Sequence, residues 1–377
     1  MRSHPATPAG PAPPRKGNPP MRSRRSVRAT LVALAATAGL LAAVPAATAS
    51  PEGPAPAASP SAGVTVKVAQ SAADRLGTAR KALMDAVSAD VLTRSHDASE
   101  LSPRTAVAQL AEEGRKVVVD VREAKGDWAR GVAYVEASRE HHGGPEGWLF
   151  LAQRENGTWV PGLEGDKAFA EHVATSPLVG KAERETITAY AEREADPQAK
   201  PGNIGIQANV NGLLLPWAPD TVMTLTGGPH AHDSATGYWS ALDFAGGSGE
   251  VRPSREGTAT SMCGAGGGWT RVIHPGGFST DYYHMHNTAY FNGTAISAST
   301  RLGSIGVDTC AGGSATGPHV HWSLRTYDAN LNGAYTWLNG RTLGGWTWYN
   351  GNAQYAGCGT RQGLTACPGT VIYNRRA

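Results

Sequence analysis

The hydrophobic and polar positions divide the chain into two regions with different periodicities. From about 64 to 200 charged residues occur throughout, and the apolar positions of 66–88 follow helical spacing. Ser102 before Pro103 predicts the start of a second helix, because serine caps the free N–H groups of the first turn and proline is tolerated there. The same spacing predicts another helix over 182–193.

Short apolar runs between these helices predict strands. The runs are residues 117–121, 128–136, 148–153 and 158–160. Asn156-Gly157 separates the last two, and Asn-Gly between apolar runs is a strong hairpin signal. These patterns predict a small α+β domain, and no candidate active site stands out within it.

The second region, from 203 to 377, has short apolar runs interrupted by glycines. Examples are 269–274, 279–285 and 319–324, and no helical period of useful length or internal repeat is present. No lysine occurs after Lys200, and most of the tryptophans and tyrosines lie here. This composition predicts a mainly β domain with many turns and an aromatic-lined groove.

The amino terminus resembles a secretory signal peptide. A basic stretch after Met21 precedes an apolar run at 31–44, which is too short to span a membrane, and 47–49 is a small-x-small cleavage signal. We therefore predict a signal peptide over 1–49, with translation starting at Met21; a membrane anchor is the less favoured alternative. No other segment is apolar enough to cross a membrane.

Two proline-containing segments predict the domain boundaries. Residues 50–63 are a linker, and 196–203 form a second linker suited to proteolytic cleavage. The expected organisation is an α+β domain at 64–195 and a mainly β domain at 204–377. The net charge of +3 is too small and too evenly spread to indicate a nucleic-acid partner.

Cysteine usage also favours export. The four cysteines are Cys263, Cys310, Cys358 and Cys367. An even number in an exported chain predicts two disulfides, and the absence of Cys-x-x-Cys spacing argues against a cysteine zinc site. Three pairings are possible. We favour the one that joins the first cysteine to the second and the third to the fourth, because the latter disulfide closes a short local loop.

Histidines carry the candidate chemistry, since seven of the 12 lie between 230 and 321. His319 and His321 alternate along a strand and face the same side. We expect His230, Asp243 and His321 to bind one zinc ion, which leaves a fourth position for water. Because imidazole titrates near neutrality, His284 and His319 are the candidates for proton transfer and oxyanion stabilisation.

Each of these residues also has a structural interpretation. A histidine beside Gly-Pro is commonly a turn residue, and Asp243 between two apolar residues suits a turn or cap. His232, His274 and His286 are nearby and composition alone does not exclude them as ligands; we interpret His232 as a turn residue. The combination is more specific than any single member.

At these positions the chain resembles the lysostaphin-like zinc peptidases, and within them the β-lytic endopeptidase group. The resemblance spans roughly 205–377 and includes Leu-Pro-Trp, the spacing from His230 to Asp243, His-Pro-Gly-Gly, Tyr-Tyr-His-Met and Ser-x-Thr-Gly-Pro-His-Val-His-Trp-Ser-Leu. It implies zinc ligation by His230, Asp243 and His321, with His284 and His319 as the accessory histidines. The favoured cysteine pairing agrees with this group.

The resemblance implies a mainly antiparallel sheet crossed by a groove and an enzyme that cleaves peptides of bacterial cell walls at glycine-containing bonds. Tyr283 and Tyr355 are candidates for the groove walls, although packing within the sheet explains each equally well. His286 departs from the group, whose members more often carry an acidic residue there. The region 64–195 resembles the propeptides of these enzymes in position; lacking cysteine, it cannot block zinc with a thiolate.

The sequence thus predicts a secreted, monomeric zinc endopeptidase that acts on peptidoglycan. Its own propeptide is expected to bind it, and the mature form is expected to have no membrane partner. Two alternatives remain open. One is a non-catalytic wall-binding domain, and the other is a general extracellular protease of glycine-rich proteins.

Overall fold

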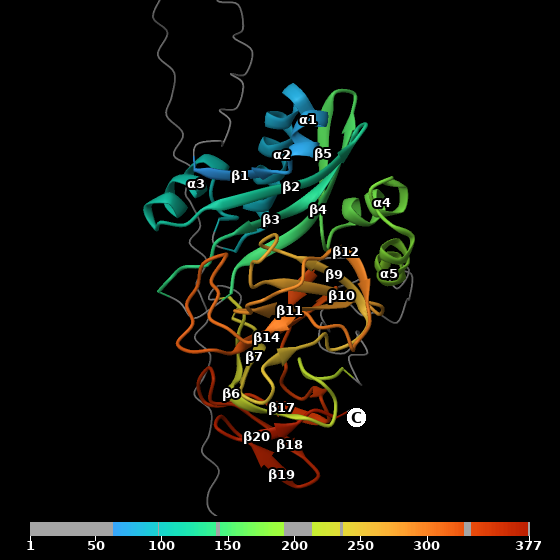
Figure 1. Cartoon of the computed structure of the whole chain (residues 1–377). Coiled ribbons are helices and arrows are strands. Elements are labelled where there is room, and N and C mark those ends of the chain that lie inside the picture. Colours follow the sequence, from blue (N-terminus) through green and yellow to red (C-terminus); the bar gives the residue numbers. More distant parts are fainter. Residues whose placement is uncertain are drawn as a thin grey trace, which may run out of the picture. The chain divides into compact units, whose positions relative to one another are not determined.

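The computed structural model describes residues 63–96, 98–140, 144–191, 213–233, 237–327 and 333–375 (Figure 1). The predicted signal peptide and both predicted linkers, apart from Gly63, lie outside the described residues. Residues 56–377 form one compact unit. Within it, the described residues up to 191 are called the N-terminal region, and those from 213 onward the C-terminal region.

The N-terminal region is a five-stranded sheet in the order β1-β2-β3-β4-β5, flanked by helices. Its elements are β1 (Val64–Val68), α1 (Gln70–Leu76), a 3-10 turn (Gly77–Ala79), α2 (Arg80–Arg94), α3 (Pro103–Glu112), β2 (Val117–Lys125), β3 (Trp128–Val135), β4 (Glu146–Glu155), β5 (Thr158–Leu163), α4 (Lys167–Thr175) and α5 (Lys181–Ala191). Strand β1 runs parallel to β2, and the other neighbours are antiparallel.

Local sequence explains most of these elements. The Ser102 hydroxyl accepts the Thr105 N–H at 3.3 Å, which confirms the predicted helix start. Asn156 and Gly157 both have positive φ, as a two-residue hairpin turn requires, so the predicted hairpin is confirmed. The helix expected over 66–88 is wrong at its start, where the alternating valines of β1 pair with β2 instead.

The C-terminal region is built on a nine-stranded antiparallel sheet in the order β12-β9-β10-β11-β14-β7-β6-β20, with β15 paired to β14. Its strands are β6 (Val222–Ala231), β7 (Trp239–Ala245), β9 (Gly257–Ser261), β10 (Thr270–His274), β11 (Phe278–Tyr283), β12 (Asn292–Ile296), β14 (Val320–Tyr327), β15 (Gly333–Tyr335) and β20 (Val371–Tyr373). Two small sheets contain β8 (Glu250–Val251) with β13 (Gly303–Ser304), and β16 (Thr342–Leu343), β17 (Trp346–Tyr349), β18 (Cys358–Arg361) and β19 (Leu364–Ala366). The mainly antiparallel β architecture expected for this half is confirmed.

Large aromatic side chains fill the core of the C-terminal region. Trp217, Trp322 and Trp348 are almost completely buried in one apolar cluster, and Trp217 packs edge-on against Phe244. Burial of an aromatic side chain of this size stabilises the fold, and its truncation to alanine typically costs on the order of 3–5 kcal/mol of unfolding free energy. The core therefore fixes the strands that carry the candidate site.

The two regions share a second apolar cluster. Trp269, just before β10, and Tyr283 of β11 pack with Tyr134 and other side chains of the N-terminal sheet, and the Tyr134 and Trp269 rings meet edge-on at 5.9 Å. The main chain also joins them, because Ala137 N–H donates to Ala311 and the Ala137 carbonyl accepts from Gly313. One face of the C-terminal sheet is thus covered by the N-terminal region.

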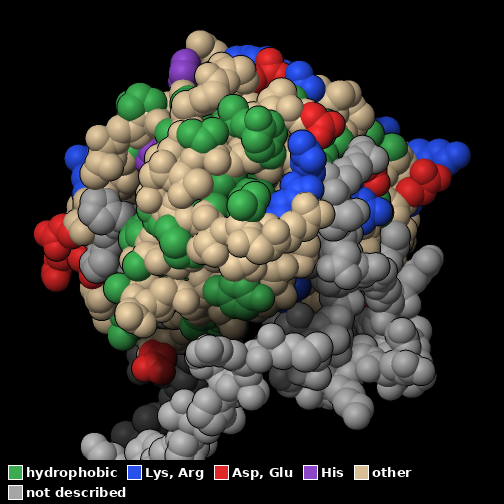
Figure 2. Space-filling view, turned by 90° about the horizontal axis from the view of Figure 1, so that it is seen from below, with side chains coloured by type: hydrophobic (Ala, Val, Ile, Leu, Met, Phe, Trp, Pro, Cys, Tyr) green, Lys and Arg blue, Asp and Glu red, His purple; other side chains and the backbone are tan. Residues whose placement is uncertain are grey.

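The opposite end of the C-terminal region is exposed and weakly charged. Figure 2 views the molecule from the end where β18, β19 and β20 lie in Figure 1, and apolar side chains are spread over that face. Leu364, Val371 and Tyr373 are each more than half exposed there. Over the described part of the chain, no helix combines the length and apolar character needed to span a membrane.

Candidate active site

Three adjacent strands bring the expected metal ligands together. In the pairing of β14 with β7, His321 lies opposite Asp243, and Asp243 in turn lies opposite Gly227 of β6. A Cβ at Gly227 would lie 2.7 Å from the Asp243 carboxylate, so glycine is what leaves room for that side chain. The register of β6 shifts between Gly227 and His230, and this irregularity turns His230 toward the other two.

The donor atoms of these residues form a compact triangle. His321 Nδ1 lies 3.1 Å from Asp243 Oδ1 and 3.2 Å from His230 Nε2, and the third side measures 3.4 Å. Ligands about 2.0–2.1 Å from a tetrahedral zinc ion are roughly 3.3–3.4 Å apart. The three donors therefore fit one zinc ion without rearrangement, and the two-imidazole, one-carboxylate set matches catalytic zinc chemistry.

The electrostatics of the triangle favour a cation. All three side chains are almost inaccessible to solvent. Burial alone would raise the pKa of Asp243, but His230 and His321 hold it well below its usual range. Burial also lowers the pKa of His321. The group at neutral pH thus consists of an ionised carboxylate facing an unprotonated imidazole, which is the state that binds metal.

Hydrogen bonds beyond the ligands fix the ring orientations. His230 Nδ1 donates to the Gly228 carbonyl at 2.8 Å, which leaves Nε2 as the ligand atom. His232 Nε2 donates to the Pro145 carbonyl at 3.1 Å, and burial holds the pKa of His232 well below its usual value, so its Nδ1 is an acceptor. That Nδ1 lies 3.1 Å from His321 Nε2. His321 then carries its proton on Nε2 and presents Nδ1 to the metal.

His232 is therefore part of the site, although we interpreted it as a turn residue from the sequence. Its backbone does lie in the bend after β6, but its ring is fully buried and also contacts the Ser323 hydroxyl at 2.8 Å. The signal for this residue was the His-x-His spacing of 230–232, which repeats that of 319–321. By contrast, the His286 side chain is exposed and His274 bonds to Glu256 and Thr280.

His284 and His319 lie beside the triangle. Their ring centroids are 4.7 Å apart, and His319 Nε2 is 3.8 Å from Asp243 Oδ1. Each donates Nδ1–H to a main-chain carbonyl, His284 to Asp308 at 2.8 Å and His319 to Gly317 at 2.7 Å. In the neutral ring Nε2 is then the acceptor. Burial, followed by the neighbouring His319 and His321, lowers the pKa of His284 to about 3.

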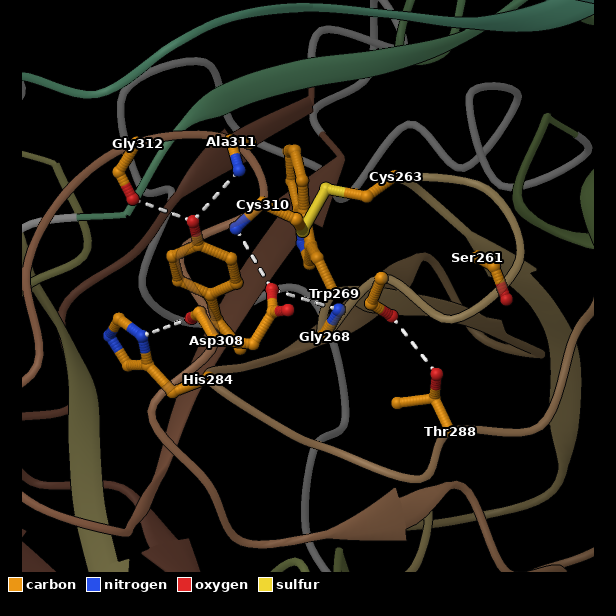
Figure 3. Close-up of a disulfide and its surroundings, with 12 residues drawn as sticks. Ser261, Cys263, Gly268, Trp269, His284, Thr288, Asp308, Cys310, Ala311 and Gly312 are labelled. Carbon is orange, nitrogen blue, oxygen red and sulfur yellow. Dashed lines mark hydrogen bonds between the residues drawn. A yellow bond between two sulfur atoms is a disulfide. The ribbon is translucent and has the colours of Figure 1, made fainter.

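The loop that holds His284 is supported by a disulfide (Figure 3). His284 follows β11 directly with φ of 65°, a left-handed conformation uncommon for histidine, and the Asp308 carbonyl secures its ring. The Asp308 carboxylate accepts N–H groups of Cys310 at 2.8 Å and Gly268 at 3.1 Å. The Cys263–Cys310 disulfide closes this loop, and Cys358 pairs with Cys367, which is the pairing we favoured.

A cavity of about 410 Å³ opens next to the triangle. Asp243, His319 and Tyr355 line it together with small residues of the 314–318 segment. Tyr355, a candidate groove residue, stacks on His230 with ring centroids 4.0 Å apart. Tyr283 does not line the cavity: it is fully buried, and its hydroxyl donates to Gly312 at 2.6 Å and accepts from Ala311.

This fold and site define a zinc metallopeptidase built on an antiparallel sheet. The model of Peptidase family M23 matches residues 237–333. The β-lytic metalloendopeptidase of Lysobacter enzymogenes is 34% identical over 148 residues, which cover 36% of this chain and 79% of that protein. The chain belongs to peptidase family M23.

Two other relatives match over shorter shares of their own length, and one solved structure matches over almost all of its chain. The β-lytic metalloendopeptidase of Achromobacter lyticus is 32% identical over 160 residues, 40% of this chain and 41% of that protein. Protease LasA of Pseudomonas aeruginosa is 37% identical over 115 residues, 28% of this chain and 26% of that protein. The solved structure titled "A Novel M23 Metalloprotease Pseudoalterin from Deep-sea" is 31% identical and covers 44% of this chain and 99% of its own, with a TM-score of 0.37.

Proposed function

We propose that this chain is a secreted endopeptidase that uses one zinc ion to hydrolyse peptide bonds in bacterial peptidoglycan, at glycine-containing cross-bridges. The observation that carries the chemistry is the triangle of His230, Asp243 and His321 beside an open cavity. The peptidoglycan substrate follows from membership of the family. Export is supported by the two disulfides, which form in oxidising compartments.

His230, Asp243 and His321 would hold the zinc ion. When bound, zinc polarises a carbonyl group and makes water a better nucleophile at neutral pH. His284 and His319 keep Nδ1 protonated through their carbonyl partners, so each presents Nε2 to accept a proton or, once protonated, to donate a hydrogen bond to a developing oxyanion. Tyr355 forms the wall of the cavity beside His230.

We further propose that residues 64–195 are a propeptide that limits activity until the chain is cut in 196–203. Its support is the contact of Pro145 with His232, together with the shared apolar cluster that covers Trp269 and Tyr283. Gly144 and Gly147 lie so close to this face that a Cβ on either would come within 2.5 Å of His232 or Trp269. A glycine-rich substrate chain would fit this surface for the same steric reason.

Zinc content and wall lysis test the catalytic proposal together. Alanine at His230, Asp243 or His321 should abolish both stoichiometric zinc and lysis of purified peptidoglycan, whereas wild type should show one zinc per chain. Unchanged lysis by His321→Ala would refute zinc catalysis, and binding of peptidoglycan without lysis by the zinc-loaded wild type would support a non-catalytic wall-binding protein instead. Equal digestion of peptidoglycan and an elastin-like polymer would support a general protease of glycine-rich proteins.

The propeptide proposal has a separate test. The intact chain and the chain cut within 196–203, with the N-terminal region removed, should differ in lytic rate, the cut form being faster. Equal rates at equal zinc content would refute inhibition while leaving the catalytic proposal intact.

A further inference from the structure

The interface between the two regions contains a buried carboxylate that belongs to one region and is bound by the other. Glu164 follows β5 in the N-terminal region and is 1% exposed. Arg271 and Arg325 of the C-terminal sheet both donate to it, the latter at 3.0 Å, and Tyr327 donates its hydroxyl. These three donors are called the carboxylate cradle.

The cradle is a built site rather than a chance pairing of surface charges. Arg271 is completely buried and held in a fixed plane by Asp281, which accepts from its Nε and Nη2 at 3.0 Å each. Arg325 lies over the Tyr335 ring at 5.2 Å. Asp281 of the same region accepts from Arg271, and Glu164 is the carboxylate that accepts from both guanidinium groups.

The contacts of the cradle also show which side it faces. Arg271 Nη1 donates to Glu164 and to the Gly147 carbonyl at 2.7 Å, and both partners belong to the N-terminal region. A cavity of about 190 Å³ adjoins Glu164 and Arg325, lined by residues of both regions. Removal of the N-terminal region would therefore take away the groups that now occupy the cradle.

The cradle lies on the same face of the sheet as the zinc ligands. Arg325 is four residues after His321 on β14, an even separation that keeps both side chains on one face. At about 3.3 Å per residue, this places the cradle roughly 13 Å along the strand from the metal triangle. An extended peptide covers that distance in about four residues.

The N-terminal region lays a short extended segment along this path. Gly144 N–H donates to the His232 carbonyl, Pro145 accepts from the His232 ring, and two residues later Gly147 accepts from Arg271. One stretch of main chain thus runs from the histidine behind the zinc ligand to the cradle. Its contacts are backbone contacts, which a different peptide could reproduce.

We propose that the carboxylate cradle of Arg271, Arg325 and Tyr327 is a substrate subsite of the processed enzyme, which binds a carboxylate of a peptide about four residues from the scissile bond. The precursor fills this subsite with Glu164. The inference rests on the proposed peptidase function for its substrate, but not for the binding chemistry. Two sources share that chemistry: an acidic side chain within the peptide, and a free carboxyl terminus.

The first test vacates the cradle in the full chain. Glu164→Ala should lower the melting temperature, and acetate should restore part of the loss, by about 2 °C or more, whereas acetamide should not. Adding Arg325→Gln to that variant should remove the acetate effect. No difference between acetate and acetamide in the folded Glu164→Ala chain would overturn the proposal.

The second test needs no Glu164 variant. In the zinc-free wild-type chain cut within 196–203, glycine-rich peptides compete with the N-terminal region, and its release is followed by size-exclusion chromatography. Peptides with glutamate three to five residues from the central bond, or with a free carboxyl terminus there, should displace it at concentrations about tenfold lower than glutamine or amide counterparts. The glutamate series and the free-terminus series show which source the cradle accepts.

Arg325→Gln should make all these peptides equivalent. Equal displacement by acidic and neutral peptides at every position in the wild-type complex would refute the subsite. Wall lysis by the zinc-loaded enzyme is measured separately: a carboxylate preference without lysis would refute the proposed function and keep the cradle, and lysis without the preference would do the reverse.

Discussion

His232 offers the sharpest test of how the metal triangle is held. Its Nδ1 faces His321 Nε2 at 3.1 Å, and its Nε2 donates to the Pro145 carbonyl. In His232→Ala the imidazole of His321 loses the acceptor that fixes its tautomer and ring plane. All three expected zinc ligands remain. The change therefore isolates ligand orientation from ligand identity.

The expected magnitude follows from the position of this hydrogen bond. Partners that orient a metal-bound imidazole typically contribute about 10–100-fold in metal affinity or activity. That factor corresponds to about 1.4–2.7 kcal/mol of zinc binding free energy. The Ser323 hydroxyl lies 2.8 Å from His232 Nδ1. In His232→Ala this hydroxyl, or a water molecule beside it, is close enough to replace part of the hydrogen bond that His321 Nε2 loses. We therefore expect the lower half of this range.

Zinc affinity is measured on the full chain by competition with a chromophoric chelator at fixed pH. His286→Ala is the matched control, because His286 is exposed and pairs with Ser304 through its backbone alone. Truncating His232 also removes its stacking on Tyr335, whose ring centroid is 4.0 Å away, so the melting temperature is recorded for each variant. A folded His232→Ala chain that binds zinc as tightly as the control would refute the orientation argument.

Three further outcomes follow from the site and the interface. His284→Ala and His319→Ala should retain zinc, measured by atomic emission, and should lower kcat by about 10²–10⁴-fold because proton transfer is lost. Loss of zinc from His319→Ala would mean that the ligand assignment of the His-x-His pair is reversed. Burial would raise the pKa of Glu164, but Arg271 and Arg325 lower the pKa overall. The stabilisation by the Glu164 carboxylate is therefore present above about pH 4.5 and is lost as the pH falls through the lower pKa of the folded state. The cut complex should dissociate more readily in acid on size-exclusion chromatography, and Glu164→Gln should weaken this pH dependence. Gly147→Ala should weaken the same complex by about 1–3 kcal/mol, because its Cβ would lie 2.5 Å from the Trp269 ring, and an unchanged dissociation constant would contradict the close packing.

The sequence was sufficient for the class of fold and for the metal triangle. Alternation places His319 and His321 on one face of a strand whatever its neighbours are, so that part of the site depends on local geometry alone. The capping serine at 102 and the Asn156-Gly157 turn are also local features, and both lie in the structure as predicted. Local sequence patterns thus predicted the structure correctly where no residue distant in the sequence determines the conformation.

Features that depend on partners far along the chain were missed. The valines of β1 form a strand because β2, some 50 residues later, offers a parallel edge, and helical spacing cannot reveal that partner. Likewise, His232 becomes part of the site only through His321 and Pro145. Burial of Tyr283 also depends on Gly312 and on the N-terminal sheet, neither of which strand alternation could indicate.

The loop between Asp308 and Gly313 has neighbours on both sides. On one side its carbonyl secures His284, and on the other its main chain pairs with Ala137 of the N-terminal region. In the processed enzyme that we propose, the second set of contacts would be absent while the first must persist for the histidine to stay in place. The disulfide between Cys263 and Cys310 would then keep the loop ordered, so oxidative folding before cleavage would be a condition for a competent enzyme.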